Sequence, residues 1–225
     1  MSVWPYPIEA IIFDCDGTIL DTLPIYFQAN DKILGFPYPR ELSKKTCGRS
    51  ELEVCTIIVN HFHLPMTPQE YLDKRNEILK STLPNSQLIP HVDDLIKKFK
   101  SMGFKMSVAT SSDRNLHELK TRNHRDLFSL FEYEVCGDEV KNAKPSPDVF
   151  QLAASKFGDI KPENILVFED AAVGVKDANN AKMPVVVIHK NNDDFHSNLD
   201  EYKANPTVIV ESFEDFDFSL FKWQP

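Results

Sequence analysis

Short apolar runs rich in β-branched residues recur along the chain, and several end abruptly at polar residues. The first covers residues 8–13 and stops at Asp14. A continuous apolar run of this length is typical of a strand that is buried on both faces, as in parallel sheets. The same pattern predicts five further strands, at residues 104–109, 133–136, 165–168, 185–188 and 207–210.

Apolar residues with helical spacing lie between these runs. They predict helices at residues 91–102, 112–122, 147–157 and 171–181. Strand and helix therefore alternate from about residue 90 onward, which is typical of an open sheet covered by helices on both faces. We predict the α/β class, with a Rossmann-like open parallel sheet as the core.

A segment after the first strand interrupts this alternation. It shows helical spacing at residues 25–34, 52–62 and 68–79 and no clear strand pattern. Thr67 followed by Pro68 is a pattern typical of the start of a helix. We therefore predict a helical insert in the α/β domain.

The resulting domain prediction is an α/β core from residues 1–21 and 87–225 and a small helical domain at residues 22–86. The proline-containing stretch 83–90 would return the chain to the core. The acidic, aromatic tail at residues 211–223 would end in a short helix.

Charge and composition limit the classes of function. The net charge of -9 disfavours binding to nucleic acids and membrane surfaces, because both are anionic. The chain has no apolar stretch of about 18 residues, and its first residues lack the basic and apolar segments of a secretory signal. We therefore predict a cytoplasmic protein that binds neither nucleic acid nor membrane.

The cysteines Cys15, Cys47, Cys55 and Cys136 have spacings that match no zinc-binding pattern. Cys15 stands between two aspartates, and Cys55 lies in an apolar helical stretch. We interpret the four as free thiols in a reducing compartment, which agrees with a cytoplasmic location.

Two aspartates follow the first predicted strand, in the segment Asp14-Cys15-Asp16-Gly17-Thr18. Two carboxylates separated by one residue at a tight turn repel one another unless a cation neutralises them. Ligation by oxygen atoms alone suits Mg²⁺, which also binds substrate phosphate. The segment therefore indicates a magnesium site that works on a phosphate group.

Three later segments place polar residues at other strand ends. Thr110 and Ser111 follow the second predicted strand, where hydroxyl and backbone N–H groups at a strand-to-helix turn can bind an anion. Lys144 precedes a predicted helix, and Glu169 and Asp170 follow the fourth strand and would complete the metal site. The carboxyl ends of parallel strands line one ligand crevice, so we expect these segments to converge.

Each segment alone has a simpler explanation. An aspartate at a strand end usually forms a turn, a Thr-Ser-Ser run usually caps a helix, and a single lysine is usually exposed on the surface. Their order along the chain and their common placement at strand ends favour a functional site.

The four segments, in this order, resemble the four motifs of the haloacid dehalogenase superfamily. Asp14-Cys15-Asp16-Gly17-Thr18 is similar to the first motif, Thr110 to the second, Lys144 to the third, and Glu169 with Asp170 to the fourth. The resemblance covers nearly the whole chain, and the helical insert resembles the small cap domain of that superfamily. It implies the corresponding α/β fold with an inserted cap.

The resemblance also implies a reaction. Asp14 would attack phosphorus and form an aspartyl-phosphate. Asp16 would protonate the leaving oxygen and then activate the water that hydrolyses this intermediate. The implied enzyme is a phosphomonoesterase, and we expect a monomer that acts on a small phosphorylated metabolite.

The implied cofactor is Mg²⁺. Asp14, the backbone carbonyl of Asp16 and Asp170 would hold it, with support from Glu169 nearby. The phosphoryl oxygens would be stabilised electrostatically by three further residues. These are Thr110, Ser111 through its backbone N–H, and Lys144.

A finer resemblance is to the eukaryotic pseudouridine-5'-phosphatases. It rests on residues 64–67, within the insert, and on residues 109–112, 144–148 and 167–171. Pseudouridine 5'-phosphate is therefore one expected substrate, beside other nucleotide and sugar phosphates. Glycerol or deoxysugar phosphatases of the yeast type stay open.

Other activities are alternatives. β-Phosphoglucomutase-like isomerases share the motifs but carry a cap histidine ten positions beyond the second aspartate, where this chain has Tyr26. Dehalogenases lack the acid that Asp16 supplies, which argues against carbon–halogen cleavage. A catalytically silent ligand-binding protein of the same fold is a remote alternative, because every catalytic residue type is present.

Three residues outside the motifs stand at positions where related enzymes have characteristic residues. Arg49 matches a cap loop that faces the active site in related enzymes, and it is either a substrate-binding cation or a surface arginine. His91 and Lys182 stand where relatives often have glycine. Lys182 would take the left-handed conformation at a helix end, at a cost of about 1 kcal/mol.

Overall fold

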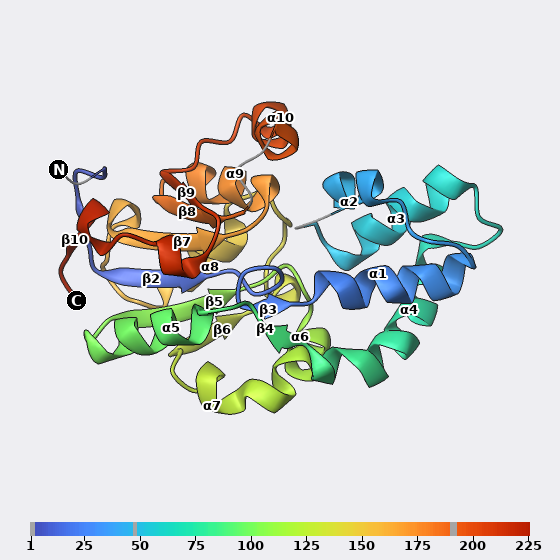
Figure 1. The fold of residues 1–225 in the computed structure, drawn as a ribbon, viewed down its shortest axis with the longest axis horizontal. Helices are drawn as coiled ribbons and strands as arrows, with labels where there is room; N and C mark the ends of the chain where they lie inside the picture. The colour runs from blue at the N-terminus through green and yellow to red at the C-terminus, as the bar shows by residue number, and fades with distance from the viewer. Residues whose placement is uncertain (1–2, 47–48, 190–192) are drawn as a thin grey trace.

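A six-stranded parallel sheet forms the centre of the larger part of the molecule in the computed structural model, which describes residues 3–46, 49–189 and 193–225 (Figure 1). Every neighbouring pair of its strands is parallel. The α/β class and the open parallel sheet are therefore confirmed, and each predicted strand agrees with the observed one to within 2 residues. In spatial order the strands are β6 (Tyr133–Val135), β5 (Lys105–Ala109), β2 (Ala10–Phe13), β7 (Ile165–Glu169), β8 (Val185–Ile188) and β9 (Val208–Val210).

The central strand β2 is apolar throughout because both of its faces are covered. Ile11 and Phe13 belong to one apolar cluster, together with residues of α5 and the C-terminal tail. Ala10 and Ile12 belong to a second cluster, with residues of α8 and α9. Burial of one such large side chain contributes about 1.5–3 kcal/mol, so the strand is fixed from both sides. The helices of this part are α5 (Val92–Ser101), α6 (Arg114–Thr121), α7 (Arg125–Phe128), α8 (Asp148–Ser155), α9 (Ala172–Asn180) and α10 (Asp193–Tyr202).

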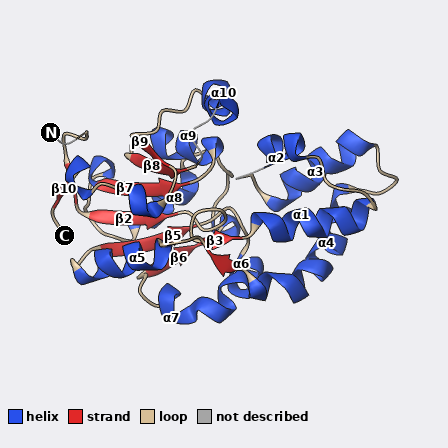
Figure 2. Ribbon diagram, viewed as in Figure 1, coloured by secondary structure: helices blue, strands red, loops and turns tan. Residues whose placement is uncertain are grey.

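In the described part of the chain, four α-helices and the 3₁₀ turn Leu83–Asn85 lie between β3 (Leu20–Asp21) and β4 (Gln87–Leu88), two short strands that pair antiparallel. The insert, which we call the cap, lies beyond the carboxyl edge of the sheet (Figures 1 and 2). It has an apolar cluster of its own, which includes Cys55, Ile58 and Tyr71. Its helices are α1 (Leu23–Leu34), α2 (Arg40–Thr46), α3 (Glu51–Phe62) and α4 (Pro68–Thr82).

The start of α4 confirms the helix-start prediction at Thr67. The Thr67 hydroxyl accepts the backbone N–H of Glu70 at 3.2 Å, and the Glu70 carboxylate accepts the backbone N–H of Thr67 at 2.7 Å. A cap of this kind contributes about 1 kcal/mol. Helices α2, α7 and α10 were not predicted. The first two are short, with 7 and 4 residues, and give little periodic signal.

The C-terminal tail differs from its prediction. It makes two 3₁₀ turns, at Phe213–Asp215 and Phe218–Leu220, and then ends in strand β10 (Lys222–Trp223) rather than in a helix. Strand β10 pairs in parallel with β1 (Pro7–Ile8). The prediction is wrong because the aromatic residues serve sheet pairing and ring packing, with the Trp223 ring 5.4 Å from that of Phe99. Strands β1 and β10 therefore lie at the end of the sheet away from the cap (Figure 1).

Two predictions from composition can be compared with the described residues. Cys15, Cys55 and Cys136 are buried free thiols, and Cys47 lies outside the described residues. No helix in the described ranges is both long and apolar enough to cross a membrane.

Candidate active site

The predicted polar segments meet at the carboxyl edge of the sheet. Asp14 follows β2 and Thr110 follows β5, and Glu169 is the last residue of β7. These three strands are neighbours in the order β5-β2-β7, so their ends lie side by side. Lys144 reaches the same point from the loop before α8. The structure thus brings the four motif segments together.

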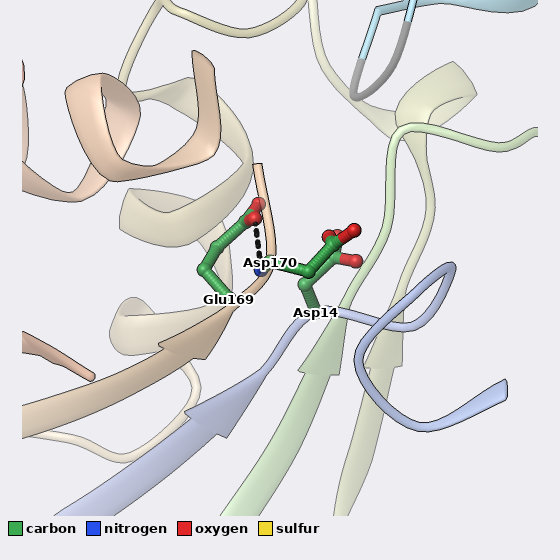
Figure 3. A group of neighbouring side chains, drawn as sticks. All are labelled: Asp14, Glu169 and Asp170. Carbon is green, nitrogen blue, oxygen red and sulfur yellow. Dashed lines mark hydrogen bonds between the residues drawn. The ribbon is translucent and has the colours of Figure 1, made fainter. Parts of the chain in front are cut away.

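Three carboxylates form a cluster at this edge. Asp14, Glu169 and Asp170 each place an oxygen atom within 4.8 Å of the other two. In Figure 3 the carboxylates of Asp14 and Asp170 lie next to each other, whereas the carboxylate of Glu169 lies apart from them, beside the chain that follows it. Its Oε2 accepts the backbone N–H groups of Asp170 at 2.7 Å and Ala171 at 2.8 Å. An all-oxygen donor set of this kind suits a hard cation such as Mg²⁺.

Lys144 supplies a positive charge to this cluster. Its Nζ donates to Asp14 Oδ1 at 2.8 Å and to Glu169 Oε1 at 2.7 Å, and the residue is 2% exposed. Both oxygens of Glu169 are therefore engaged, one by Lys144 and one by the turn at Asp170. Gly174 leaves the space for this arrangement, because a β-carbon there would lie 1.6 Å from Glu169 Oε1. Glu169 thus fixes Lys144 and the turn that carries Asp170.

The acidic cluster holds three carboxylates against the single positive charge of Lys144. Burial raises the pKa of Asp14 to about 7 against the opposing charge of Lys144, and Glu169 adds to the rise. Burial, with Glu169 and Asp14 nearby, raises the pKa of Asp170 well above its usual range. No hydrogen bond to the Asp170 carboxylate is found among the described residues. A divalent cation would let these carboxylates ionise together, so the residues fit the predicted metal.

The carboxylate of Asp16 faces a separate set of donors. Its Oδ1 accepts the Thr22 hydroxyl at 2.8 Å, and its Oδ2 accepts the hydroxyls of Thr110 and Ser112, each at 3.2 Å. Lys120 of α6 also donates to Oδ2. Burial alone would raise the pKa of Asp16, but Lys120 and the hydrogen bonds hold it below its usual value. The Thr110 hydroxyl, predicted to face the phosphoryl group, therefore contacts Asp16.

Sequence reasoning did not single out Lys120, Ser112 or Thr22. One signal for Lys120 was present, because it follows Leu116 by four residues and so lies on the same face of the helix. Leu116 and Lys120 are both buried, at 3% and 0% exposure. A lysine on the apolar face of a helix needs a buried counter-charge, and Asp16 supplies it.

A cavity lies between the cap and the acidic edge of the sheet, bounded by Asp14, Asp16, Asp170, Ser111 and Ser112 on the core side. The cap side is formed largely by aromatic and polar side chains. They are Leu23, Tyr26, Phe27, Asn30, Tyr38, Thr46, Arg49, Glu51, Val54 and Arg75.

Glu51 and Arg75 form an ion pair in the wall of this cavity. Arg75 is 1% exposed, and its guanidinium lies 5.5 Å from the centre of the Tyr26 ring. The Tyr26 hydroxyl donates to Glu51 Oε1 at 3.2 Å. Burial and the neighbouring Glu51 raise the pKa of Tyr26 well above its usual value, so the phenol stays protonated at neutral pH.

Arg49 lines the same cavity and also contacts the core. Its guanidinium donates to the Tyr202 hydroxyl, at the end of α10, at 2.7 Å, and to the backbone carbonyl of Lys45 at 2.8 Å. The structure therefore places Arg49 at the rim of the cavity, where it joins the cap to the core.

Comparison with known proteins identifies related chains. The chain matches the haloacid dehalogenase-like hydrolase family over residues 11–188. It is 40% identical over 213 residues to a Drosophila melanogaster protein named "Probable pseudouridine-5'-phosphatase". This match covers 91% of this chain and 90% of the relative. It is 36% identical over 190 residues to "(DL)-glycerol-3-phosphatase 2" of Arabidopsis thaliana, covering 80% and 79%. A β-phosphoglucomutase structure from Clostridium difficile shares the fold, with a TM-score of 0.76, 22% identity and 94% coverage of each chain.

Proposed function

The chain belongs to the haloacid dehalogenase-like hydrolases, as its motifs predict, and from that premise we propose a Mg²⁺-dependent phosphomonoesterase whose first candidate substrate is pseudouridine 5'-phosphate. The chain is a phosphatase of this family, like the relatives it matches. One observation carries the proposal. Asp14 is 6% exposed, lies between the Lys144 ammonium and the Asp170 carboxylate, and lines the cavity beneath the cap.

In the proposed first step, a carboxylate oxygen of Asp14 attacks phosphorus, and the bond from phosphorus to the leaving oxygen breaks. Asp16 is ionised in the free site, so it takes up a proton when the negative charge of the bound phosphate favours its protonated form. It gives this proton to the leaving oxygen, so the alcohol leaves neutral. In the second step, water attacks the phosphorus of the aspartyl-phosphate and gives its proton to Asp16. The bond from phosphorus to Asp14 breaks, which restores the Asp14 carboxylate and releases phosphate.

Other residues support both steps electrostatically. Lys144 lies 2.8 Å from Asp14 and is aimed at the place where phosphoryl oxygens would gather negative charge. The backbone N–H of Ser111 and the nearby Thr110 belong to the turn at the same edge. Asp14, Asp170 and the backbone carbonyl of Asp16 would hold Mg²⁺, with Glu169 behind them. When bound, the ion supplies charge neutralisation at the phosphoryl group.

The cavity wall supports a neutral leaving group that carries hydrogen-bond donors. Glu51 presents a carboxylate that accepts hydrogen bonds, and its pairing with Arg75 leaves little net charge to attract a second anionic group. The aromatic side chains of Tyr26, Phe27 and Tyr38 offer apolar surface for a flat ring. The uracil ring of pseudouridine has both properties, being planar with two N–H groups.

Tyr26 argues against the isomerase alternative. It stands where the mutase-like enzymes carry a cap histidine, and its phenol is held by Glu51 with a pKa far above neutral. A residue in that state does not exchange protons with a sugar hydroxyl near neutral pH. Water is therefore the proposed acceptor of the phosphoryl group.

We propose a core domain of residues 1–21 and 87–225 and a cap domain of residues 22–86, which the separate apolar cluster of the insert supports. The expected enzyme is a cytoplasmic monomer that acts on a small phosphorylated metabolite.

A substrate screen tests the proposal. Phosphate release would be measured with pseudouridine 5'-phosphate, uridine 5'-phosphate, glycerol 3-phosphate and sugar phosphates, with isomerisation of β-glucose 1-phosphate followed in parallel. We expect phosphate release, loss of activity with EDTA and recovery with Mg²⁺. Isomerisation without phosphate release would establish the alternative activity, and activity that ignores chelation would contradict the metal assignment.

A further inference from the structure

Lys120 is a fully buried lysine beside the candidate active site, with 0% exposure. Among the described residues its ammonium hydrogen-bonds Asp16 Oδ2 and the Ser112 hydroxyl, the latter at 2.6 Å. Removing an ammonium group from water costs several kcal/mol, and this cost is recovered only with a well-placed counter-charge. Lys120 therefore occupies a position that the fold can tolerate only because Asp16 is there.

Packing does not explain the choice of a lysine at this place. A buried ion pair is often replaced by apolar residues with no loss of stability, so it is weak evidence for a stabilising role. Helix α6 is already anchored by Leu116, which packs with Leu79 and Leu83 of the neighbouring segment. An apolar residue at position 120 would serve the same packing without the desolvation cost.

The two carboxylate oxygens of Asp16 have different hydrogen-bond donors. Among donors in the described residues, Oδ2 accepts hydrogen bonds from Lys120, Ser112 and Thr110, whereas Oδ1 accepts one, from Thr22 at 2.8 Å. One oxygen is thus held by three donors of the core, and the other by a single hydroxyl at the start of α1.

We propose that Lys120 is a positioning residue that fixes Oδ2 of Asp16 and leaves Oδ1 as the oxygen that exchanges protons. The proposal rests on the proposed function, in which Asp16 protonates the leaving oxygen and then accepts a proton from water. Lys120 touches neither the substrate nor the phosphoryl group in this account. It acts by holding the Asp16 carboxylate at one end.

Leaving-group chemistry separates the two steps. p-Nitrophenolate leaves without help from an acid, so the transfer of phosphate from p-nitrophenyl phosphate to Asp14 depends little on Asp16. Hydrolysis of the aspartyl-phosphate needs Asp16 as a base for every substrate. An alkyl phosphate such as glycerol 3-phosphate needs Asp16 in both steps.

The test uses Lys120→Met, which keeps the length of the side chain and removes the charge. With p-nitrophenyl phosphate and Mg²⁺, we expect the first burst of p-nitrophenolate to stay within about 3-fold of the wild-type rate, while the steady-state rate falls by about 10-fold or more. Turnover of glycerol 3-phosphate should fall at least as far. Lys120→Arg should recover part of the steady-state rate, because it keeps a charged donor. Lys100→Met, at an exposed lysine of α5, should behave as wild type.

An equal fall in burst and steady-state rates, or an unchanged steady-state rate, would overturn the proposal. If Lys120→Met does not fold, as thermal unfolding would reveal, Ser112→Ala decides, because it removes a second donor to Oδ2. In Ser112→Ala the steady-state rate should again fall more than the burst rate, by a smaller factor than in Lys120→Met. Equal decreases in the burst rate and the steady-state rate would overturn the proposal. A wild-type protein with neither burst nor turnover would instead contradict the proposed function.

Discussion

Gly17 and Asp170 approach so closely that a β-carbon on Gly17 would lie 2.1 Å from Asp170 Oδ2. Gly17 also has a φ of +87°, a conformation that glycine adopts at little cost. The glycine of the first motif therefore has two physical tasks. It turns the chain after Asp16, and it leaves room for the carboxylate of Asp170, in the loop that follows β7.

A substitution at Gly17 tests the contact between Gly17 and Asp170. Gly17→Ala should displace the Asp170 carboxylate, raise the Mg²⁺ concentration needed for half-maximal activity and lower kcat by at least about 10-fold. Gly158→Ala is the matched control, because Gly158 has a φ of +88° with open space around its β-carbon position. It should cost about 1–2 kcal/mol of stability and leave activity intact. Mg²⁺ titrations of both variants check this, and equal Mg²⁺ dependence would contradict it.

Arg49 should contribute to the binding of the natural leaving group. Arg49→Ala should raise KM about 10-fold for the best substrate of the screen, because a hydrogen bond to a charged group contributes about 1.5–3 kcal/mol. KM for p-nitrophenyl phosphate, which lacks a large polar leaving group, should change little. Tyr202→Phe removes the partner of Arg49 at 2.7 Å and should have a smaller effect. Equal changes for both substrates would make Arg49 a structural residue only.

Asp177 of α9 is an uncompensated buried acid. Neither of its carboxylate oxygens has a hydrogen-bond partner among the described residues. Burial raises its pKa to about 8 against the opposing charge of Lys144, with Glu169, Asp14 and Asp148 adding to the rise. The folded chain therefore keeps the Asp177 proton between about pH 4 and pH 8, where the unfolded chain loses it.

This difference predicts a pH-dependent loss of stability. The folded state binds the extra proton, so its free energy of unfolding falls as pH rises through this window, by at most about 1.4 kcal/mol per pH unit. Asp177→Asn should match the wild type near pH 4 and be more stable near pH 8. Urea unfolding at several pH values measures the difference. A difference that stays constant with pH would show that Asp177 is not the cause.

Lys182 carries strain that glycine would remove. It follows α9 with a φ of +64°, as predicted for a left-handed helix end, and its side chain is exposed. Lys182→Gly should raise the free energy of unfolding by up to about 1 kcal/mol. Lys156 ends α8 with a φ of -74°, so Lys156→Gly should lower stability instead. Thermal unfolding of the two variants tests the contrast, and a change of the same sign in both would contradict it.

The sheet and the motif residues could be predicted because their signals are local. A strand buried on both faces is an unbroken apolar run, as Ile11 and Ile12 illustrate. Parallel strands have their carboxyl ends at one edge, so Asp14, Thr110 and Glu169 had to lie close together once the strands were known.

The second layer of the site depends on packing that no local pattern encodes. Glu51 and Arg75 lie 24 residues apart on α3 and α4, and their pairing follows from how these helices pack. From the sequence alone, Lys120 cannot be distinguished from an ordinary lysine on the surface of a helix, because its role depends on the position of Asp16. In the tail, Trp223 took a strand position because β1 offered an edge to pair with.

Mapping the site of phosphorylation tests directly whether Asp14 is the nucleophile. The enzyme would be quenched in acid during turnover of p-nitrophenyl phosphate with Mg²⁺, digested, and mapped by mass spectrometry, with Asp93→Asn, at a surface aspartate of α5, as a control. We expect phosphate on the peptide that contains Asp14, in the wild type and in the control, and no phosphopeptide and no turnover in Asp14→Asn. Phosphate on another residue, or turnover by Asp14→Asn at the wild-type rate, would contradict this assignment.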